Sequence, residues 1–347
     1  MKKKIEIKAA VLSKIDHDLE LKKIYHEGNL LRNQVLVKIH YTGICGSQLG
    51  EISGVKGKDK YLPHLLGHEA TGRIVDISPQ IKSLKKNDKV ILHWQRNYGA
   101  DSKTPIYVDK ENKKINAGWV TTFNNYAVVS KNRLTKLPKK ISLKYGVLFG
   151  CALTTAYGSI FKDSKINLKR ENKILITGGG MIGQSILFLI TSEGQAISIL
   201  EKNIEKINFI KKNYPGVNII KTLDKINHYD YIYETTGVSS VIEKSYRSIK
   251  LIGKLLLIGV PNSKTKISIN TLEINYGKKI IGSYGGGVIP NKDIDKIILH
   301  MKKKKISLKK LCRFYNLKDN AKILDIGCGK GFFLKELFRH IKKSVLF

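Results

Sequence analysis

The sequence predicts an α/β protein that combines a β-rich, barrel-like region with a doubly wound parallel sheet. The first observation is a series of short β segments, divided by Gly, Asn, Pro and Lys, over residues 1 to about 145. The second is an alternation of strands and helices from about residue 170 onwards. The third is the length of 347 residues, which is enough for two domains with substantial buried cores.

Four apolar segments carry the prediction of the β-rich region. They are rich in the β-branched and aromatic residues that favour strands, and turn-forming residues separate them. Their sequences are "QVLVKIHYTGIC", "ATGRIVDIS", "DKVILHW" and "NNYAVVS". We therefore expect a largely β, barrel-like domain.

The later part of the chain alternates between two kinds of apolar pattern. The predicted strands are "KILITGG", "AISILE", "YDYIYETTG" and "KLLLIGV", and the predicted helices between them are "MIGQSILFLITSEG", "IEKINFIKKNY" and "VIEKSYRSI". Strands that are joined by helices form parallel sheets with helices on their faces. This order predicts a doubly wound domain.

The first turn of that domain has the glycine pattern of a nucleotide-binding loop. Gly178, Gly180 and Gly183 form GxGxxG between a predicted strand and a predicted helix. In this context the glycines allow a tight turn, the approach of a pyrophosphate and close packing of helix on strand. Met181 and Ile182 complete the predicted turn, and the free N–H groups of the helix N-terminus favour phosphate.

An acidic residue follows the second strand, where it can select the cofactor. Glu201 stands where a carboxylate accepts hydrogen bonds from both hydroxyls of the adenosine ribose, which predicts NAD rather than NADP. The alternative is a helix-capping or surface glutamate. Lys206 is a further candidate contact, and with Lys202 it keeps NADP open.

Charge and composition narrow the classes of partner. The 63 Lys and Arg residues against 28 Asp and Glu residues give a formal net charge of +35. The lysines are spread along the chain beside Ile and Asn, and no RNA-stacking platform or zinc finger accompanies them. We interpret the charge as compositional bias and expect no specific nucleic-acid partner. A charge this large should still attract anions non-specifically.

Segments for targeting or for membrane insertion are not apparent. No stretch of about 18 apolar residues predicts a membrane span, and the basic N-terminus has no apolar core typical of a signal peptide. The four cysteines are widely separated: Cys45, Cys151, Cys312 and Cys328. A reducing cytoplasm is the expected location.

Four motifs in register give the chain a family resemblance. "YTGICGSQ", "LLGHEATGRIVDIS", "LFGCALTTAYGS" and the glycine turn follow one another as in the zinc-dependent medium-chain alcohol dehydrogenases, which the chain resembles from about residue 5 to 317. The resemblance implies a GroES-like catalytic domain (residues 1–150 and 290–317) around a Rossmann NAD-binding domain (residues 151–289). A homo-oligomer, dimer or tetramer, is also implied.

The resemblance implies one catalytic zinc site. Cys45, His68 and Cys151 match the family's three protein ligands, and Glu69 matches its carboxylate close to the metal. Two thiolates and an imidazole leave the fourth tetrahedral position open for substrate. On the residues alone, cysteines this far apart are more often buried small side chains, and Glu69 fits a structural salt bridge equally well.

Two hydroxyl residues match family positions near the reaction. Ser47 corresponds to the residue that takes the proton of the alcohol, and Thr155 corresponds to a residue in contact with the nicotinamide. A turn-capping serine and an ordinary helix threonine are the alternatives. The expected reaction moves a hydride between NAD(H) and a small alcohol, polyol or sugar-derived substrate.

Some positions depart from the family pattern. Gln48 stands where many relatives have an acid, and Gly50 stands where some have a histidine, so the outer proton path must differ or use water. His64 and His93 match no ligand position. The segment after "DKVILHW" has no cysteines, so we expect no structural zinc.

The C-terminal tail, residues 318–347, carries a different motif. "AKILDIGCGKGFFLKEL" resembles the glycine-rich loop of S-adenosylmethionine-dependent methyltransferases, with glycines at 327, 329 and 331. The chain ends before the further strands that such an enzyme needs. We interpret the tail as a truncated fragment and hypothesise that its helix, residues 332–343, closes the catalytic domain.

Three functions therefore compete on the sequence. An NAD-dependent, single-zinc alcohol or polyol dehydrogenase is favoured. A methyltransferase remnant is opposed by the missing strands, and a catalytically impaired, anion-binding fusion product is suggested by the charge and the unusual tail.

Overall fold

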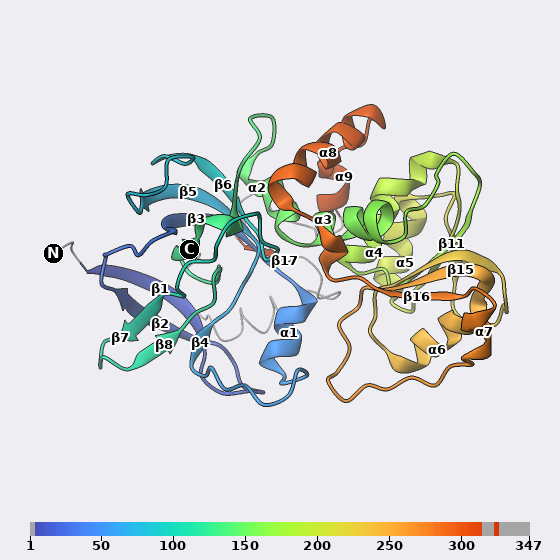
Figure 1. Ribbon diagram of the computed structural model, residues 1–347, viewed down its shortest axis with the longest axis horizontal. Coiled ribbons are helices and arrows are strands. Elements are labelled where there is room, and N and C mark those ends of the chain that lie inside the picture. Colours follow the sequence, from blue (N-terminus) through green and yellow to red (C-terminus); the bar gives the residue numbers. More distant parts are fainter. Residues whose placement is uncertain (1–3, 314–322, 326–347) are drawn as a thin grey trace. The chain divides into compact units, whose positions relative to one another are not determined.

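The computed structural model describes residues 4–313 and 323–325. The chain divides into two compact units. The first unit comprises Met1–Cys151, Ile289–Ile294 and Tyr315–Phe347, and the second comprises Ala152–Val288 and Asp295–Phe314. Figure 1 shows strands predominating in the first unit and a sheet flanked by helices in the second.

Five strands of the first unit close into a small barrel. Their order around the barrel is β1-β2-β7-β8-β4. Their bounds are β1 (Ile5–Leu12), β2 (Glu20–His26), β4 (His64–Leu65), β7 (Ile106–Asp109) and β8 (Lys114–Asn116). The barrel buries apolar side chains inside, among them Ile7, Ile24 and Tyr107.

A six-stranded sheet makes up the rest of the first unit's strands. The order is β10-β6-β5-β3-β17, and β9 also pairs with β3. The bounds are β3 (Gln34–Ile44), β5 (Ala70–Ile77), β6 (Lys89–Leu92), β9 (Tyr126–Ser130), β10 (Leu134–Lys136) and β17 (Ile323–Asp325). Val35, Ile74 and Val129 lie in its apolar core, so each of the four predicted β segments supplies a strand.

Short helices connect the strands of this unit. They are α1 (Gly46–Ile52), η1 (Lys131–Arg133), α2 (Leu143–Gly146) and η2 (Val147–Gly150). The Ser142 side chain caps α2 by accepting a hydrogen bond from the amide of Tyr145 at 3.3 Å. Cys45 is the N-cap of α1 and has an extended backbone conformation, so it joins the end of β3 directly to the helix.

The second unit contains a six-stranded parallel sheet in the order β13-β12-β11-β14-β15-β16. Its strands are β11 (Lys173–Thr177), β12 (Ala196–Leu200), β13 (Asn218–Ile220), β14 (Tyr229–Glu234), β15 (Ile249–Leu257) and β16 (Lys279–Gly282). The order reverses beside β11, as in doubly wound folds, where ligands bind at the carboxyl ends of the strands. The α/β fold class expected from the sequence is confirmed.

The helices from Ala152 onwards belong to the second unit, except that the first residues of α8 belong to the first unit. They are α3 (Ala152–Gly158), η3 (Ser159–Asp163), α4 (Met181–Ile190), η4 (Thr191–Glu193), α5 (Ile204–Asn213), α6 (Ser239–Ser248), α7 (Leu272–Asn275), η5 (Gly285–Gly287), α8 (Pro290–Lys303) and α9 (Leu308–Arg313). Helix α6 packs on β14 and β15 and buries Ile242 and Tyr246. Helix α4 lies beside β11 with nearly all of its residues buried.

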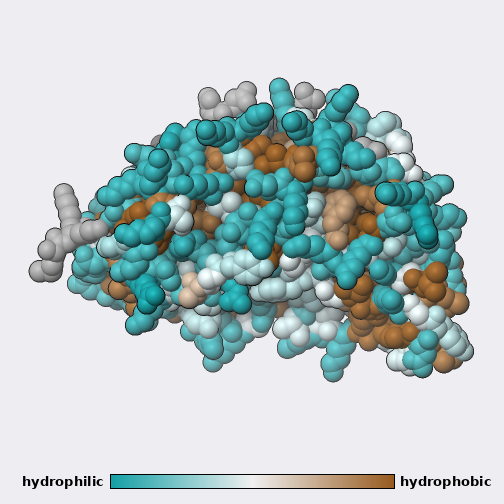
Figure 2. Space-filling view, turned by 45° about the horizontal axis from the view of Figure 1, so that its top comes forward, coloured by the Kyte–Doolittle hydropathy of each residue, from teal (hydrophilic) through white to brown (hydrophobic). Residues whose placement is uncertain are grey.

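The surface agrees with the dispersed charge of the sequence. On the face in Figure 2, hydrophilic residues extend across the whole face and are interrupted by smaller hydrophobic areas. Among the residues that the structure describes, no helix has the length and apolar character required to cross a membrane.

The predicted strand before the tail motif is present in part. Ile323–Asp325 form β17, which pairs in parallel with Thr42–Ile44 of β3. The strand that would open a methyltransferase fold is therefore an added strand of the first unit's sheet. The hypothesised helix over residues 332–343 lies outside the described residues.

Candidate metal centre and nucleotide-binding turn

Four side chains with metal-binding groups converge in the first unit. They are Cys45, His68, Glu69 and Cys151, and one ligand atom from each lies within 4.8 Å of the others. Cys45 follows β3, His68 and Glu69 directly precede β5, and Cys151 follows η2. The structure thus brings together the four residues that the family resemblance implied.

Strand pairing explains why these distant residues meet. Strands β3 and β5 are antiparallel, with Thr42 opposite Ala70, so the end of β3 lies beside the start of β5. The amide of Gly43 donates to the carbonyl oxygen of Glu69 at 2.9 Å. On the other side, the amide of Trp94 donates to the carbonyl oxygen of Gly150 at 3.3 Å, next to Cys151.

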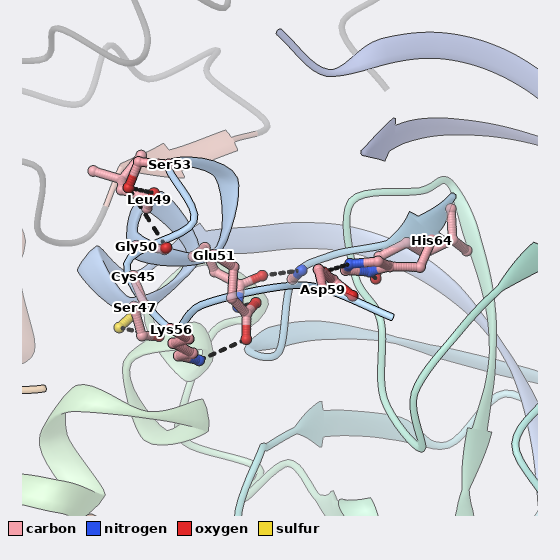
Figure 3. Close-up of polar contacts among 12 residues, drawn as sticks. Cys45, Ser47, Leu49, Gly50, Glu51, Ser53, Lys56, Asp59 and His64 are labelled. Atoms are coloured by element: carbon pink, nitrogen blue, oxygen red, sulfur yellow. Dashed lines mark hydrogen bonds and ion pairs between the residues drawn. The ribbon is translucent and has the colours of Figure 1, made fainter. Parts of the chain in front are cut away.

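The two thiols of the cluster are close but reduced. The Sγ atoms of Cys151 and Cys45 lie 3.9 Å apart, and neither cysteine forms a disulfide. The Ser47 hydroxyl donates to Cys45 Sγ at 3.4 Å (Figure 3). The hydrogen bond from Cys151, helped by His68 and Ser47 and opposed by burial, holds the pKa of the Cys45 thiol well below its ordinary value.

The other two residues of the cluster, His68 and Glu69, have buried polar atoms without a hydrogen-bond partner among the described residues. These atoms are Nε2 of His68 and both carboxylate oxygens of Glu69. The salt bridge that the sequence left open for Glu69 is thus not found in this part of the chain. Burial, and to a lesser extent the charge of Cys45, raises the pKa of the Glu69 carboxyl well above its ordinary value.

The cluster fits a zinc ion. Unpaired buried polar atoms are costly unless a ligand satisfies them. Two sulfur ligands and an imidazole nitrogen are a preferred donor set for Zn²⁺, and a lowered thiol pKa favours the thiolate that binds metal. The orphaned Nε2 of His68 points to a metal ion more directly than to a further hydrogen bond.

The two histidines that match no ligand position, His64 and His93, have hydrogen-bond partners. Nε2 of His64 lies 2.7 Å from Asp59 Oδ2, and its Nδ1 lies 3.0 Å from the carbonyl oxygen of Leu65. His93 is fully buried, with Nδ1 at 2.6 Å from the carbonyl oxygen of Gln95 and Nε2 at 3.0 Å from Thr135 Oγ1. Burial lowers the pKa of His93 to about 4.

The glycine turn of the second unit lies between β11 and α4. Gly178 has φ of +93°, a conformation that side chains other than glycine rarely adopt. A Cβ atom at Gly183 would lie 2.0 Å from the carbonyl oxygen of Gly178. Gly180 is the N-cap of α4, and Met181 and Ile182 begin that helix. The amides at this end can receive a phosphate group.

Glu201 faces this turn from the end of β12. Its Oε2 accepts from the amide of Gly179 at 2.7 Å, and its Oε1 accepts from the amides of Lys202 and Asn203 at 2.8 Å each. Nζ of Lys206 lies 3.7 Å from Oε2. The carboxylate is therefore held at the edge of the predicted nucleotide site with a cation beside it.

Thr155 and one unexpected residue complete the description of the second unit. Thr155 is buried on α3, and its carbonyl oxygen accepts from the Ser159 hydroxyl at 2.9 Å. Glu234, which the sequence reading missed, is fully buried and accepts from Thr177 Oγ1 at 3.3 Å and from the amide of Gly237 at 3.1 Å. Its only sequence signal is an acid at the end of an apolar strand.

Comparison with known proteins shows what part of the first unit is similar to. Residues 32–139 match the model of the alcohol dehydrogenase GroES-like domain. A similar protein, alcohol dehydrogenase-like 5 of Arabidopsis thaliana, is 24% identical over 346 residues, with 88% of each chain covered. The S-(hydroxymethyl)glutathione dehydrogenase of Komagataella pastoris is 24% identical over 326 residues, which cover 82% of this chain and 84% of that one.

Solved structures share the fold at low sequence identity. The benzyl alcohol dehydrogenase from Acinetobacter calcoaceticus has a TM-score of 0.74 at 20% identity, with 88% of this chain and 91% of that chain covered. These comparisons provide no support for a methyltransferase fragment in the tail.

Proposed function

We propose that the chain is a zinc-containing medium-chain alcohol dehydrogenase, as its match to the GroES-like domain model supports, and that it moves a hydride between NAD(H) and a small alcohol, polyol or related carbonyl compound. At the coarser level it is an NAD(P)-dependent, zinc alcohol dehydrogenase-type oxidoreductase. The single observation that carries the proposal is the convergence of Cys45, His68, Glu69 and Cys151 with buried, unpartnered ligand atoms.

We assign one zinc ion to this cluster. Cys45, His68 and Cys151 would hold it, and Glu69 lies close enough to approach it without being required as a constant ligand. Bound there, the ion would supply Lewis-acid chemistry that polarises an alcohol or carbonyl group. Three protein ligands leave a position for substrate.

Ser47 is the proposed proton carrier at the site. Its hydroxyl is positioned by the first turn of α1 and by its hydrogen bond to Cys45 Sγ. A hydroxyl both donates and accepts, so Ser47 Oγ can accept a proton from an alcohol and release its own toward solvent. The turn-capping alternative has less support, because the N-cap of α1 is Cys45 and no side-chain hydrogen bond caps that end among the described residues.

The glycine turn supports the choice of a dinucleotide cofactor. The amides at the start of α4 would contact the pyrophosphate, with Gly180, Met181 and Ile182 in this position. Glu201 would accept hydrogen bonds from the ribose hydroxyls and repel a 2′-phosphate, which favours NAD. Lys206 acts in the opposite direction. Thr155 is proposed as the nicotinamide contact on the family resemblance.

Two further expectations follow from the proposed chemistry. Thiols 3.9 Å apart stay available to zinc only while they are reduced, which favours a cytoplasmic location. A homo-oligomer, dimer or tetramer, is expected from the family and is measurable by light scattering.

Metal analysis combined with a substrate screen tests the function. The purified full chain should contain about one zinc per chain and should change NADH absorbance with at least one alcohol, polyol or aldehyde. Protein that takes up no zinc from a zinc-supplemented medium, or that neither binds nor turns over NAD(H), would contradict the proposal. The methyltransferase alternative predicts a rise in melting temperature with S-adenosylmethionine instead.

A further inference from the structure

A series of polar contacts runs along α1 and ends beside His68. The ammonium of Lys56 lies 2.6 Å from Oε1 of Glu51, as Figure 3 shows. The other oxygen of Glu51, Oε2, accepts from Nε2 of Gln48 at 2.8 Å. Oε1 of Gln48 accepts a hydrogen bond from the backbone amide of Gly67, the residue before His68.

The carboxylate of Glu51 determines which way the Gln48 amide faces. An ionised carboxylate only accepts hydrogen bonds, whereas a glutamine amide has one accepting oxygen and one donating NH₂ group. The NH₂ group of Gln48 must therefore face Glu51, and its oxygen must face the amide of Gly67. Gln48 is buried, so a reversed amide would leave polar groups unsatisfied away from water.

Gly67 occupies a tight position in front of His68. Its φ of +87° suits glycine, and a Cβ atom there would lie 2.3 Å from Oγ1 of Thr122. On the other side of His68, the carbonyl oxygen of Glu69 accepts from Thr42 Oγ1 at 3.1 Å. Gln48 thus anchors the residue before His68, while Thr42 anchors the residue after it.

Gln48 and Glu51 on α1 are complementary, because one donates the hydrogen bond that the other accepts. An acid at position 48 would place a second carboxylate next to Glu51, and two carboxylates at that distance repel each other. With glutamine at position 48, every contact from Lys56 to Gly67 joins a donor to an acceptor. The unusual Gln48 and the acid three residues later form one unit.

We propose that Glu51 is a positioning residue that orients Gln48 and thereby holds Gly67 and His68 in the metal-binding conformation. This proposal rests on the proposed zinc function. Glu51 acts through Gln48 and the backbone. Residues that orient a metal ligand without touching the metal commonly affect how tightly the metal is held, so replacing them changes metal retention.

The rate of zinc release tests this role without relying on activity. In the zinc-loaded full chain, Glu51→Gln should release zinc to a chromogenic chelator roughly 10-fold faster than the unmodified protein, because the Gln48 amide can then reverse. The metal-free forms should melt at similar temperatures, since Glu51 lies on a short helix with its side chain 28% exposed.

An exchange of the two side chains is the rescue experiment. In the double variant Gln48→Glu with Glu51→Gln, the carboxylate at position 48 accepts from Gly67 and from the new amide, whose oxygen accepts from Lys56. All three contacts are preserved, so zinc release should return close to the original rate. Gln48→Glu alone brings two carboxylates together and should release zinc faster.

Two control variants separate the orientation of the Gln48 amide from the simple loss of a charge as the cause of faster zinc release. Lys56→Gln removes the ion pair but leaves Glu51 as an acceptor, so it should change zinc release little. Glu111→Gln removes an equivalent charge from an exposed pair with Lys113 at 2.8 Å and should have no effect. Acceleration by Lys56→Gln equal to that of Glu51→Gln would overturn the orientation argument.

The remaining outcomes separate this proposal from the proposed function. If the unmodified chain holds one zinc and Glu51→Gln releases it no faster, the positioning role is wrong while the dehydrogenase function stands. Failure of the exchanged pair to restore zinc retention has the same meaning. If the unmodified chain binds no zinc, both proposals are wrong.

Discussion

The metal cluster of the first unit and the glycine turn of the second are built in opposite ways. The cluster consists of buried side chains, and its two cysteines are 106 positions apart in the chain. The turn is a contiguous segment between β11 and α4, in which Gly178 takes a positive φ and a Cβ atom at Gly183 would collide with the Gly178 carbonyl oxygen. The metal cluster depends on the chemical groups of its side chains, whereas the glycine turn depends on its backbone conformation and on the small size of glycine.

This difference determines how each site can fail. A cluster of side chains loses its function when one donor atom is removed, even if the fold is unchanged. A backbone turn tolerates changes of chemistry but not of volume, because an added methyl group meets a carbonyl oxygen or the ligand itself. Substitutions in each unit therefore separate zinc binding from cofactor binding.

The largest expected effect is the loss of zinc on removal of one thiol. Cys151→Ala should abolish stoichiometric zinc and reduce turnover to background, because two ligands do not hold the ion as three do. Binding of NADH, followed by fluorescence, should persist. Cys312→Ala is the matched control, since this cysteine lies outside the sequence motifs that match the family's zinc ligands. Loss of NADH binding in Cys151→Ala would show that the two sites are not independent.

The reciprocal change is a methyl group in the turn. Gly183→Ala places Cβ at 2.0 Å from the Gly178 carbonyl oxygen, and such overpacking costs about 1–3 kcal/mol. We expect weaker NADH binding, a lower melting temperature and normal zinc content. Gly180→Ala is the comparison. Among the described residues its Cβ would meet no atom within 4 Å, so the variant should weaken NADH binding by obstructing the pyrophosphate while stability changes less.

A smaller effect is expected at the edge of the turn, where a side chain does participate. Glu201→Ala should weaken NAD binding roughly 10-fold or more, since hydrogen bonds to a charged group contribute about 1.5–3 kcal/mol, and should shift preference toward NADP. Lys206→Met should shift preference the other way, because a cation 3.7 Å from the carboxylate attracts a 2′-phosphate. Equal kcat/KM for NAD and NADP in the unmodified enzyme would contradict the ribose assignment.

The same contrast explains what the sequence could predict. The alternation that begins with "KILITGG" predicted the parallel sheet, and the structure has β11, β12, β14 and β15 at the predicted strands. The glycine turn was apparent because all its residues lie in one short segment. The sheet and the turn could both be predicted because the hydrophobic periodicity and the steric requirement for glycine are properties of residues that are close together in the sequence.

The cluster could not be found in this way. Nothing in the residues around Cys45 indicates Cys151, because the contact between them arises from the pairing of β3 with β5 and from the turn after η2. The family resemblance supplied these residues. The pairing of Gln48 with Glu51 follows helical spacing, but its contact with Gly67 depends on tertiary structure. Buried Glu234 was missed for the same reason.

The smallest effect is expected for the stability of the first unit in acid, which should depend on His93. His93 is fully buried in the first unit, and burial together with the charge of Arg133 lowers its pKa, to about 4. Its Nδ1 donates to Gln95, and its Nε2 accepts from Thr135 Oγ1, contacts that suit the neutral ring. In the unfolded chain the ring binds a proton below about pH 6.5.

Between pH 6.5 and about 4 the unfolded state therefore binds one more proton at this residue than the folded state. The free energy of unfolding of the first unit should fall as the pH falls, by about 1.4 kcal/mol per unit. Tryptophan fluorescence reports on this unit alone, because both tryptophans, Trp94 and Trp119, belong to it. The metal-free Cys151→Ala background avoids acid release of zinc. In this background, His93→Gln should flatten the dependence of the unfolding free energy on pH, whereas His228→Gln in the second unit should leave it unchanged. Equal slopes for the background and for both variants would show that the acid sensitivity comes from other groups than His93.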